Sequence, residues 1–167
     1  MNDYEYPLFD RYPLHAEFNR RWWYIKHGMG RSAAEMLDAE RIIARMSADV
    51  ISPLQLSGEE VEAVQMDRSK FEVRIGYDGD DELWHLYPGK SHFTGILGEV
   101  FRGELYLRIP AYDAAQASRL AIERIGRIQA ILNDQQTCIA QFEEQLPDLI
   151  RAEVRRCRHE AVGSHLN

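Results

Sequence analysis

The sequence predicts an α+β fold: two N-terminal helices, a central antiparallel meander of three to five strands, and long C-terminal helices packed on one sheet face. Near both ends of the chain, apolar residues recur every three or four positions, which is the periodicity of an amphipathic helix. In the middle they alternate with polar residues, which is the periodicity of a half-buried strand. The length of 167 residues corresponds to about one domain.

We expect residues 1–167 to form a single domain with four consecutive parts. They are an extended arm (1–13), a helical segment (14–50), a sheet (54–110) and a second helical segment (113–162). Two prolines disfavour a helix in the arm, because proline lacks a backbone N–H and clashes with the preceding helical turn.

The first helix is expected from about Leu14 to His27, where Gly28 would take the left-handed position that ends many helices. One face of this helix is apolar and carries Leu14, Phe18, Trp22 and Ile25. A second helix should begin at Ser32, because Ser32-x-x-Glu35 matches a capping box that satisfies the first backbone donors. It is expected to end before Ser52-Pro53.

The central strands are predicted from alternation and from turn residues. Residues 71–77 alternate strictly, and Asp78-Gly79 then predicts a hairpin with a return strand over Leu83–Tyr87. The remaining candidates are a clear strand over residues 104–109, a weaker one over Val61–Met66, and the stretch 92–102, which fits either a strand or an irregular excursion.

The C-terminal helical segment should open at Asp113, because Asp113-x-x-Gln116 is a second capping-box pattern. Only Gln135 interrupts its apolar stripe, which consists of Ile125, Ile128, Leu132, Ile139, Phe142, Leu146 and Leu149. Asn133-x-x-Gln136 could cap a new helix, and Pro147 removes a backbone donor. We therefore expect two or three consecutive helical pieces.

Composition narrows the classes of function. A net charge of −7 makes nucleic acid an unfavourable partner, because such binding depends on cations that neutralise phosphates. The longest aliphatic and aromatic run, Trp22–Ile25, is far too short to span a membrane, and the acidic N-terminus does not resemble a signal peptide. Cys138 and Cys157 are far apart on a helix, so reduced thiols and a cytoplasmic location are expected.

The most informative stretch is Trp22-Trp23-Tyr24 in the first helix. Consecutive helical side chains point about 100° apart, so one neighbouring element cannot bury all three. Either the N-terminal arm covers Trp23 and Tyr24, or these two residues contact another chain, since Trp and Tyr are enriched at interface hot spots. A homodimer is expected, because two-fold dimers are the commonest oligomers.

An acidic tip, defined as Asp78, Asp80, Asp81 and Glu82, lies at the expected hairpin. It belongs to the most acidic part of the chain, since residues 53–110 hold 11 acidic and 6 basic residues. Such a surface would attract a basic protein partner, or it would simply keep the chain in solution. We assign the acidic tip, together with Trp23 and Tyr24, to partner binding.

Two further groups of residues support alternative interpretations of the function. His85 and His92, with Asp81 and Glu82, could form an enzyme or small-ligand site through imidazole and carboxylate chemistry. Their spacing matches no metal-ligand signature, so we expect neither a metal nor a cofactor. A C-terminal Arg face could bind nucleic acid, or it could stabilise a helix end; it consists of Arg151, Arg155, Arg156 and Arg158.

The sequence therefore predicts a small cytoplasmic protein-interaction protein, such as an adaptor, a chaperone or an inhibitor of immunity type. The alternative is an enzyme or small-ligand-binding domain with its site near His85 and His92. Nucleic-acid binding through the C-terminal Arg face is the weaker alternative.

Overall fold

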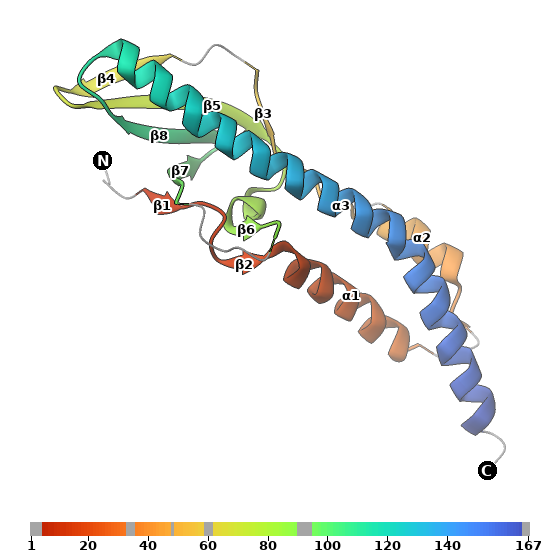
Figure 1. Cartoon of the computed structure of the whole chain (residues 1–167). Helices are drawn as coiled ribbons and strands as arrows, with labels where there is room; N and C mark the ends of the chain where they lie inside the picture. The colour runs from red at the N-terminus through yellow and green to blue at the C-terminus, as the bar shows by residue number, and fades with distance from the viewer. Residues whose placement is uncertain (1–4, 33–35, 48, 59–61, 90–94, 165–167) are drawn as a thin grey trace. The chain divides into compact units, whose positions relative to one another are not determined.

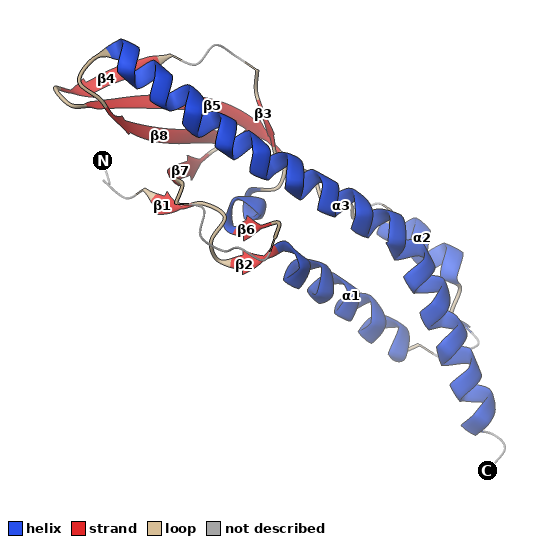
Figure 2. Ribbon diagram, viewed as in Figure 1, coloured by secondary structure: helices blue, strands red, loops and turns tan. Residues whose placement is uncertain are grey.

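The computed structural model describes residues 5–32, 36–47, 49–58, 62–89 and 95–164 and confirms the α+β class (Figures 1 and 2). In chain order its elements are β1 (Tyr6–Pro7), β2 (Tyr12–Pro13), α1 (Leu14–Gly30), α2 (Ala39–Met46), β3 (Gln55–Leu56), β4 (Ala63–Asp67), β5 (Lys70–Asp78), the 3₁₀ helix η2 (Asp81–His85), β6 (Leu86–Tyr87), β7 (Leu97–Phe101), β8 (Glu104–Pro110) and α3 (Ala114–Ser164).

The chain divides into two compact units, each built from two separate stretches of sequence. The sheet unit comprises residues 1–14 and 52–137, and the helical unit comprises residues 15–51 and 138–167. The single domain expected over residues 1–167 stays a prediction, because compactness does not decide whether two units unfold together.

The sheet unit is organised around the antiparallel pair β5 and β8, at the centre of a sheet with the order β1-β7-β8-β5-β3. Strand β4 also pairs with β5. Apolar residues meet directly across the central pair: Phe71 opposite Ile109, Val73 opposite Leu107 and Ile75 opposite Leu105. All of these side chains are buried, which explains the strict alternation in the sequence.

The first half of α3 lies along one face of this sheet, as predicted (Figure 2). The small side chains of Ala117 and Ala121 are fully buried there, and Ile128 and Leu132 continue the buried stripe. The predicted cap at Asp113 is present, since Asp113 Oδ1 accepts the backbone N–H of Gln116 at 2.7 Å. The return bond of a capping box is shifted by one residue, because Gln116 Oε1 accepts the N–H of Tyr112 at 2.8 Å rather than that of Asp113.

The prediction of a hairpin at Asp78-Gly79 is wrong. Gly79 has φ +117°, and a Cβ there would lie 2.5 Å from the backbone oxygen of Pro53, so this glycine serves a close chain crossing. Residues 81–85 then form η2, and the expected return strand is reduced to β6, which pairs in parallel with β2. The turn between β7 and β8 lies instead at Arg102-Gly103, where both residues have positive φ, as in a type I′ hairpin.

The predicted helix boundaries also need correction. Helix α1 continues to Gly30 rather than ending at His27, so Gly28 lies inside the helix. Helix α2 begins at Ala39, because Asp38 caps it by accepting the backbone N–H groups of Glu40 and Arg41. The expected start at Ser32 is therefore wrong, and Glu35 of the proposed box lies outside the described residues.

Helix α3 is a single helix of 51 residues, not two or three pieces. The side chains of Gln135 and Gln136 bond to backbone oxygens of the sheet unit, so Gln136 is not used for a new helix cap. Pro147 lies inside the helix. A proline there removes one backbone hydrogen bond and crowds the preceding turn, and the buried side chains of Ile139 and Ile150 anchor the helix on either side of it.

Candidate functional site

The exposed face of α1 carries an aromatic patch, which we define as Trp23, Tyr24 and His27. Trp23 and Tyr24 are 56% and 58% exposed. The Trp23 ring stacks on His27 at 4.8 Å and meets the edge of Tyr24 at 5.1 Å, so the three rings support one another. The opposite face of α1 buries Ile25 and Met29, which accounts for the orientation of the patch.

The described residues 5–13 of the N-terminal arm belong to the sheet unit, whereas these aromatic residues belong to the helical unit. Leu8 and Phe9 of the arm are buried in the sheet unit, where Phe9 lies 5.4 Å from the ring of Trp84. Trp23 and Tyr24 stay more than half exposed. The patch therefore remains available to another molecule.

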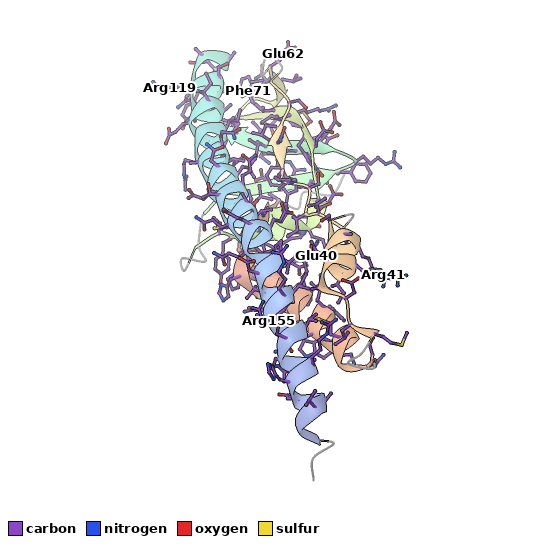
Figure 3. The ribbon with its side chains drawn as sticks, turned by 90° about the vertical axis from the view of Figure 1, so that its right-hand side faces the viewer. Glu40, Arg41, Glu62, Phe71, Arg119 and Arg155 are labelled. Atoms are coloured by element: carbon purple, nitrogen blue, oxygen red, sulfur yellow. The ribbon has the colours of Figure 1, made fainter. Side chains whose placement is uncertain are left out.

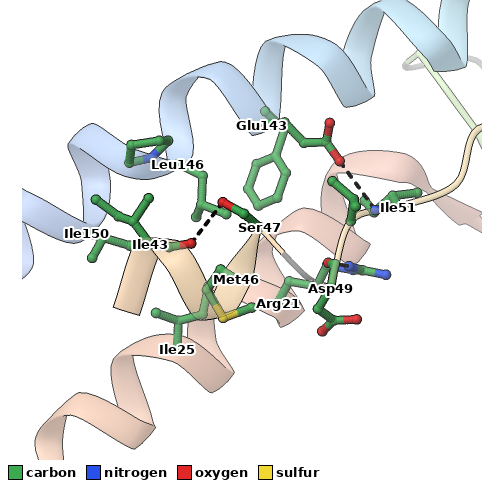
Figure 4. Close-up of a pocket in the computed structure, with 13 residues that line it drawn as sticks. Arg21, Ile25, Ile43, Met46, Ser47, Asp49, Ile51, Glu143, Leu146 and Ile150 are labelled. Carbon is green, nitrogen blue, oxygen red and sulfur yellow. Dashed lines mark hydrogen bonds between the residues drawn. The ribbon is translucent and has the colours of Figure 1, made fainter. Parts of the chain in front are cut away.

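A cavity of about 140 Å³ lies within the helical unit, between α1, α2, Ser47, the residues 49–51 and α3 (Figure 4). Nine of its lining residues are apolar: Ile25, Ile43, Met46, Val50, Ile51, Phe142, Leu146, Pro147 and Ile150. Two of its polar groups bond to the backbone of residues 49–51, since Glu143 accepts the N–H of Ile51 and Arg21 donates to the carbonyl of Asp49. We call it the three-helix cavity; its size is that of a cavity that admits one small apolar molecule.

A wider depression of about 400 Å³ lies between α1 and α2, and we call it the α1–α2 groove. Its apolar lining comes mainly from Tyr24, Ile25, Met29, Met36, Leu37, Ile42 and Met46. Arg41 and Arg45 line it from α2, and Figure 3 shows Arg41 projecting outward from that helix. A second depression of about 360 Å³ shares Tyr24, Ile25 and Met46 with the groove and is lined also by Arg20, Arg21 and Asp49.

Two of the four carboxylates of the acidic tip accept hydrogen bonds within the sheet unit. Asp81 accepts a hydrogen bond from the hydroxyl of Tyr77 at 2.7 Å, and burial together with this bond raises the pKa of Tyr77 well above its ordinary value. Asp80 accepts the backbone N–H of Ser52 at 3.0 Å. Asp78 and Glu82 are exposed. The acidic tip belongs to the sheet unit, whereas Trp23 and Tyr24 belong to the helical unit.

The residues of the alternative enzyme site are only partly visible. His85 is half-buried at the end of η2, where burial and then the charge of Arg11 lower the pKa of its imidazole. Asp81 is engaged by Tyr77, and His92 lies outside the described residues. Within the described ranges, no group of three or more His, Cys, Asp and Glu side chains is placed to hold a metal ion.

Most of the C-terminal Arg face is engaged within the helical unit. Arg151 pairs with Glu40 of α2 at 2.9 Å and with Asp148 at 3.0 Å. Arg156 pairs with Glu153 and Glu160, and the hydrogen bond from Arg156 lowers the pKa of Glu153. Arg158 donates to the backbone oxygen of Leu37. Among the described residues of this face, only Arg155, exposed on α3 (Figure 3), has no ion-pair or hydrogen-bond partner.

Sequence reasoning missed the α1–α2 groove and the three-helix cavity. Both depend on the angle between helices, which periodicity does not encode. One signal was present: three of the chain's five methionines, Met29, Met36 and Met46, line the groove. Methionine is over-used at adaptable binding surfaces, because its side chain is flexible and polarizable.

The fold and these surfaces define an α+β protein whose helical unit carries an aromatic patch and adjoining depressions with apolar lining residues. In the part of the chain that the structure describes, no helix is both long and apolar enough to cross a membrane. Comparison with protein-family models, with curated proteins and with solved structures finds no match.

Proposed function

We propose that this chain is a protein-interaction protein that binds its partner through the aromatic patch of α1. The observation that carries the proposal is the exposure of Trp23 and Tyr24, at 56% and 58%, on a helix whose other face is packed. Their mutual ring contacts fix the side chains before any partner binds, so little side-chain entropy is lost on association. Rigid, exposed Trp and Tyr are the residues that most often anchor protein interfaces.

The proposal keeps three expectations from the sequence. A cytoplasmic location is supported by Cys138 and Cys157, neither of which forms a disulfide. A homodimer is supported by the same exposed aromatic residues, since a second copy could cover them. Steering of a basic partner by the acidic tip is a separate prediction, for which Asp78 and Glu82 offer exposed carboxylates.

The test is affinity capture with the full chain immobilised, followed by kinetics with the protein that is retained. A Trp23→Ala, Tyr24→Ala double variant should lose a partner that the wild-type chain holds in stoichiometric amount. Tyr112→Ala is the matched control, because Tyr112 is an 87% exposed aromatic residue outside the patch. Trp23→Ala alone should raise the dissociation rate about 30-fold, which corresponds to a hot-spot loss of about 2 kcal/mol.

Circular dichroism of each variant separates lost binding from lost folding. Equal capture by the wild-type chain and by the folded double variant would contradict the proposal. If Tyr112→Ala also loses the partner, capture depends on exposed aromatic residues in general rather than on the aromatic patch.

A further inference from the structure

The α1–α2 groove has the features of a surface built to receive another helix. Its floor is apolar, and the exposed Met36 and Tyr24, at 81% and 58%, stand at its edges. The adjoining depression shares Tyr24, Ile25 and Met46 with it, so the hollow surface continues past Tyr24 of the aromatic patch. Adjoining depressions with an apolar floor between helices offer the arrangement that receives the apolar face of an amphipathic helix.

Gly28 is a second, independent feature of the groove. It lies inside α1, where glycine is less favourable than every residue except proline. Its φ is not in the left-handed region, and a Cβ at this position would meet nothing of this chain within 4 Å. Neither backbone conformation nor internal packing therefore requires glycine there. Its missing side chain leaves the groove open beside Tyr24 and Met29, where another backbone can approach closely.

The charged residues that line the groove and its neighbouring depression favour a partner of opposite, negative charge. Four cations line the two depressions, Arg20, Arg21, Arg41 and Arg45, against two carboxylates, Asp38 and Asp49. Asp38 is already engaged as the cap of α2. Among the described residues, Arg41 and Arg45 have no ion-pair partner. A local excess of positive charge on a chain with net charge −7 is opposite to what general solubility would produce.

Arg20 and Arg21 add to this field although they are partly paired. Both share one carboxylate, since Glu17 bonds to Arg20 at 2.7 Å and to Arg21 at 3.1 Å. Burial acts to raise the pKa of Glu17, but these two guanidinium groups outweigh it and lower that pKa, so Glu17 stays ionised. One of the two positive charges is left uncompensated, and Arg20 also lies over the ring of Tyr24 at 5.9 Å.

We propose that the α1–α2 groove binds an acidic amphipathic helix of a partner protein, with apolar side chains of that helix seated against Met29, Ile42 and Met46 and its carboxylates facing Arg41 and Arg45. This inference rests on the proposed function, because Tyr24 belongs to both surfaces. It adds the chemistry of the partner: an apolar face with spacing i, i+3/i+4, i+7, flanked by Asp or Glu.

The probe is a synthetic helical peptide with leucine at those positions and glutamate at its flanks, titrated into the full chain by fluorescence anisotropy. A second, control peptide has every glutamate replaced by lysine. The acidic peptide should bind at least tenfold more tightly than the basic one. Its affinity should fall as salt rises from about 0.1 M to about 1 M, because the screening length shortens from about 10 Å to about 3 Å.

Two variants locate the site, and each has a matched control on another surface. Gly28→Leu should weaken the acidic peptide at least tenfold by filling the groove, whereas Gly126→Leu, at another helical glycine with open space around it, should leave affinity unchanged. Arg41→Glu with Arg45→Glu should have a similar effect, whereas Arg155→Glu, on α3, should not. Light scattering measures the oligomeric state of the free wild-type chain and of the free Gly28→Leu variant.

Equal binding of the two peptides, or binding that survives both groove variants, would overturn the assignment. The assignment would also be overturned if the wild-type chain forms a dimer and the Gly28→Leu variant does not, because the groove would then bind a second copy. If the peptide fails while captured protein still depends on Trp23, the groove inference falls and the proposed function stands. If the peptide binds as expected while capture is independent of Trp23, the proposed use of the aromatic patch falls and the groove stands.

Discussion

The sheet unit and the helical unit bury apolar surface to different extents. Val73, Leu105 and Leu107 in the sheet unit are completely buried, and a Cβ on Gly98 would lie only 3.0 to 3.2 Å from the side chains of three leucines. In the helical unit, α2 contributes no buried residue, and Ile42, Ile43 and Met46 are only partly covered. The cavity and the two depressions described above all belong to this unit.

The difference follows from how strands and short helices pack. Seven residue pairs fix the register of β5 against β8, so every inward side chain meets a defined neighbour. Helix α2 has eight residues, about two turns, and such a short helix covers only a few neighbours. The sheet unit is therefore the more closely packed of the two, while the helical unit leaves more of its apolar surface only partly covered.

The largest expected effect is a loss of unfolding free energy, and it should differ between two truncations, one in each unit. Leu107→Ala should cost about 4–5 kcal/mol of unfolding free energy, because its tightly packed site cannot collapse around the lost side chain. Ile150→Ala should cost about 2–3 kcal/mol, because Ile150 already lines the three-helix cavity and its surroundings can relax. Urea unfolding measures both, and equal costs would contradict the difference between the units.

The same unfolding experiment tests the predicted single domain. Trp84 reports from the sheet unit, and Trp22 and Trp23 report from the helical unit. A variant with Trp22→Phe and Trp23→Phe, and another with Trp84→Phe, therefore follow the units separately. Each variant's fluorescence transition should coincide with its own transition by circular dichroism for a single cooperative domain, and separated midpoints would show two.

The next effect concerns Gln135, a buried polar residue in the stripe of α3. Its amide donates to the backbone oxygens of Leu83 and Leu86 at 2.8 and 2.6 Å. Gln135→Leu should cost about 1–3 kcal/mol, because the carbonyl of Leu86 would lose this donor inside the sheet unit, whereas that of Leu83 keeps the backbone N–H of Leu86. Gln129→Leu is the control, since Gln129 bonds only to Asn133 on the exposed side. Equal stability of the two variants would show that Gln135 is not a structural donor.

A smaller effect of opposite sign is expected at Gly126. This residue lies inside α3 with open space around it, so a methyl group there meets nothing. Gly126→Ala should raise the unfolding free energy by about 0.5–1 kcal/mol, because alanine loses less conformational entropy in a helix. Thermal unfolding measures the gain. A destabilised variant would indicate that α3 bends or is covered at this point.

The smallest effect is a pH dependence from His85. Its pKa is lowered below 6.5 in the fold, so the unfolded chain takes up this proton first as pH falls. The unfolding free energy should therefore decrease as pH is lowered from about 6.5 toward the folded pKa. His85→Gln should show a shallower decrease between about pH 7.5 and about pH 5.5 than the wild-type chain. An identical decrease would assign the pH dependence to other groups.

The sequence by itself determined the elements whose signal is periodic and local. Strands β5 and β8 were predicted because each alternates against one buried layer, and the start of α3 because Asp113 and Gln116 carry the capping chemistry. The exposure of Trp23 and Tyr24 was foreseen as one of two outcomes, since three consecutive aromatic residues cannot share one helix face.

The tertiary structure decided everything that depends on contacts distant in sequence. From the sequence, Asp78-Gly79 predicts a hairpin. In the structure, the positive φ of Gly79 serves the close crossing with Pro53, a residue that only folding brings near. Gln135 interrupted the stripe in the sequence and proved to be buried, because its partners Leu83 and Leu86 lie about fifty residues away along the chain. The α1–α2 groove likewise arises from the packing of two helices, and hydrophobic periodicity specifies which face of a helix is apolar but not how much of it a neighbour covers.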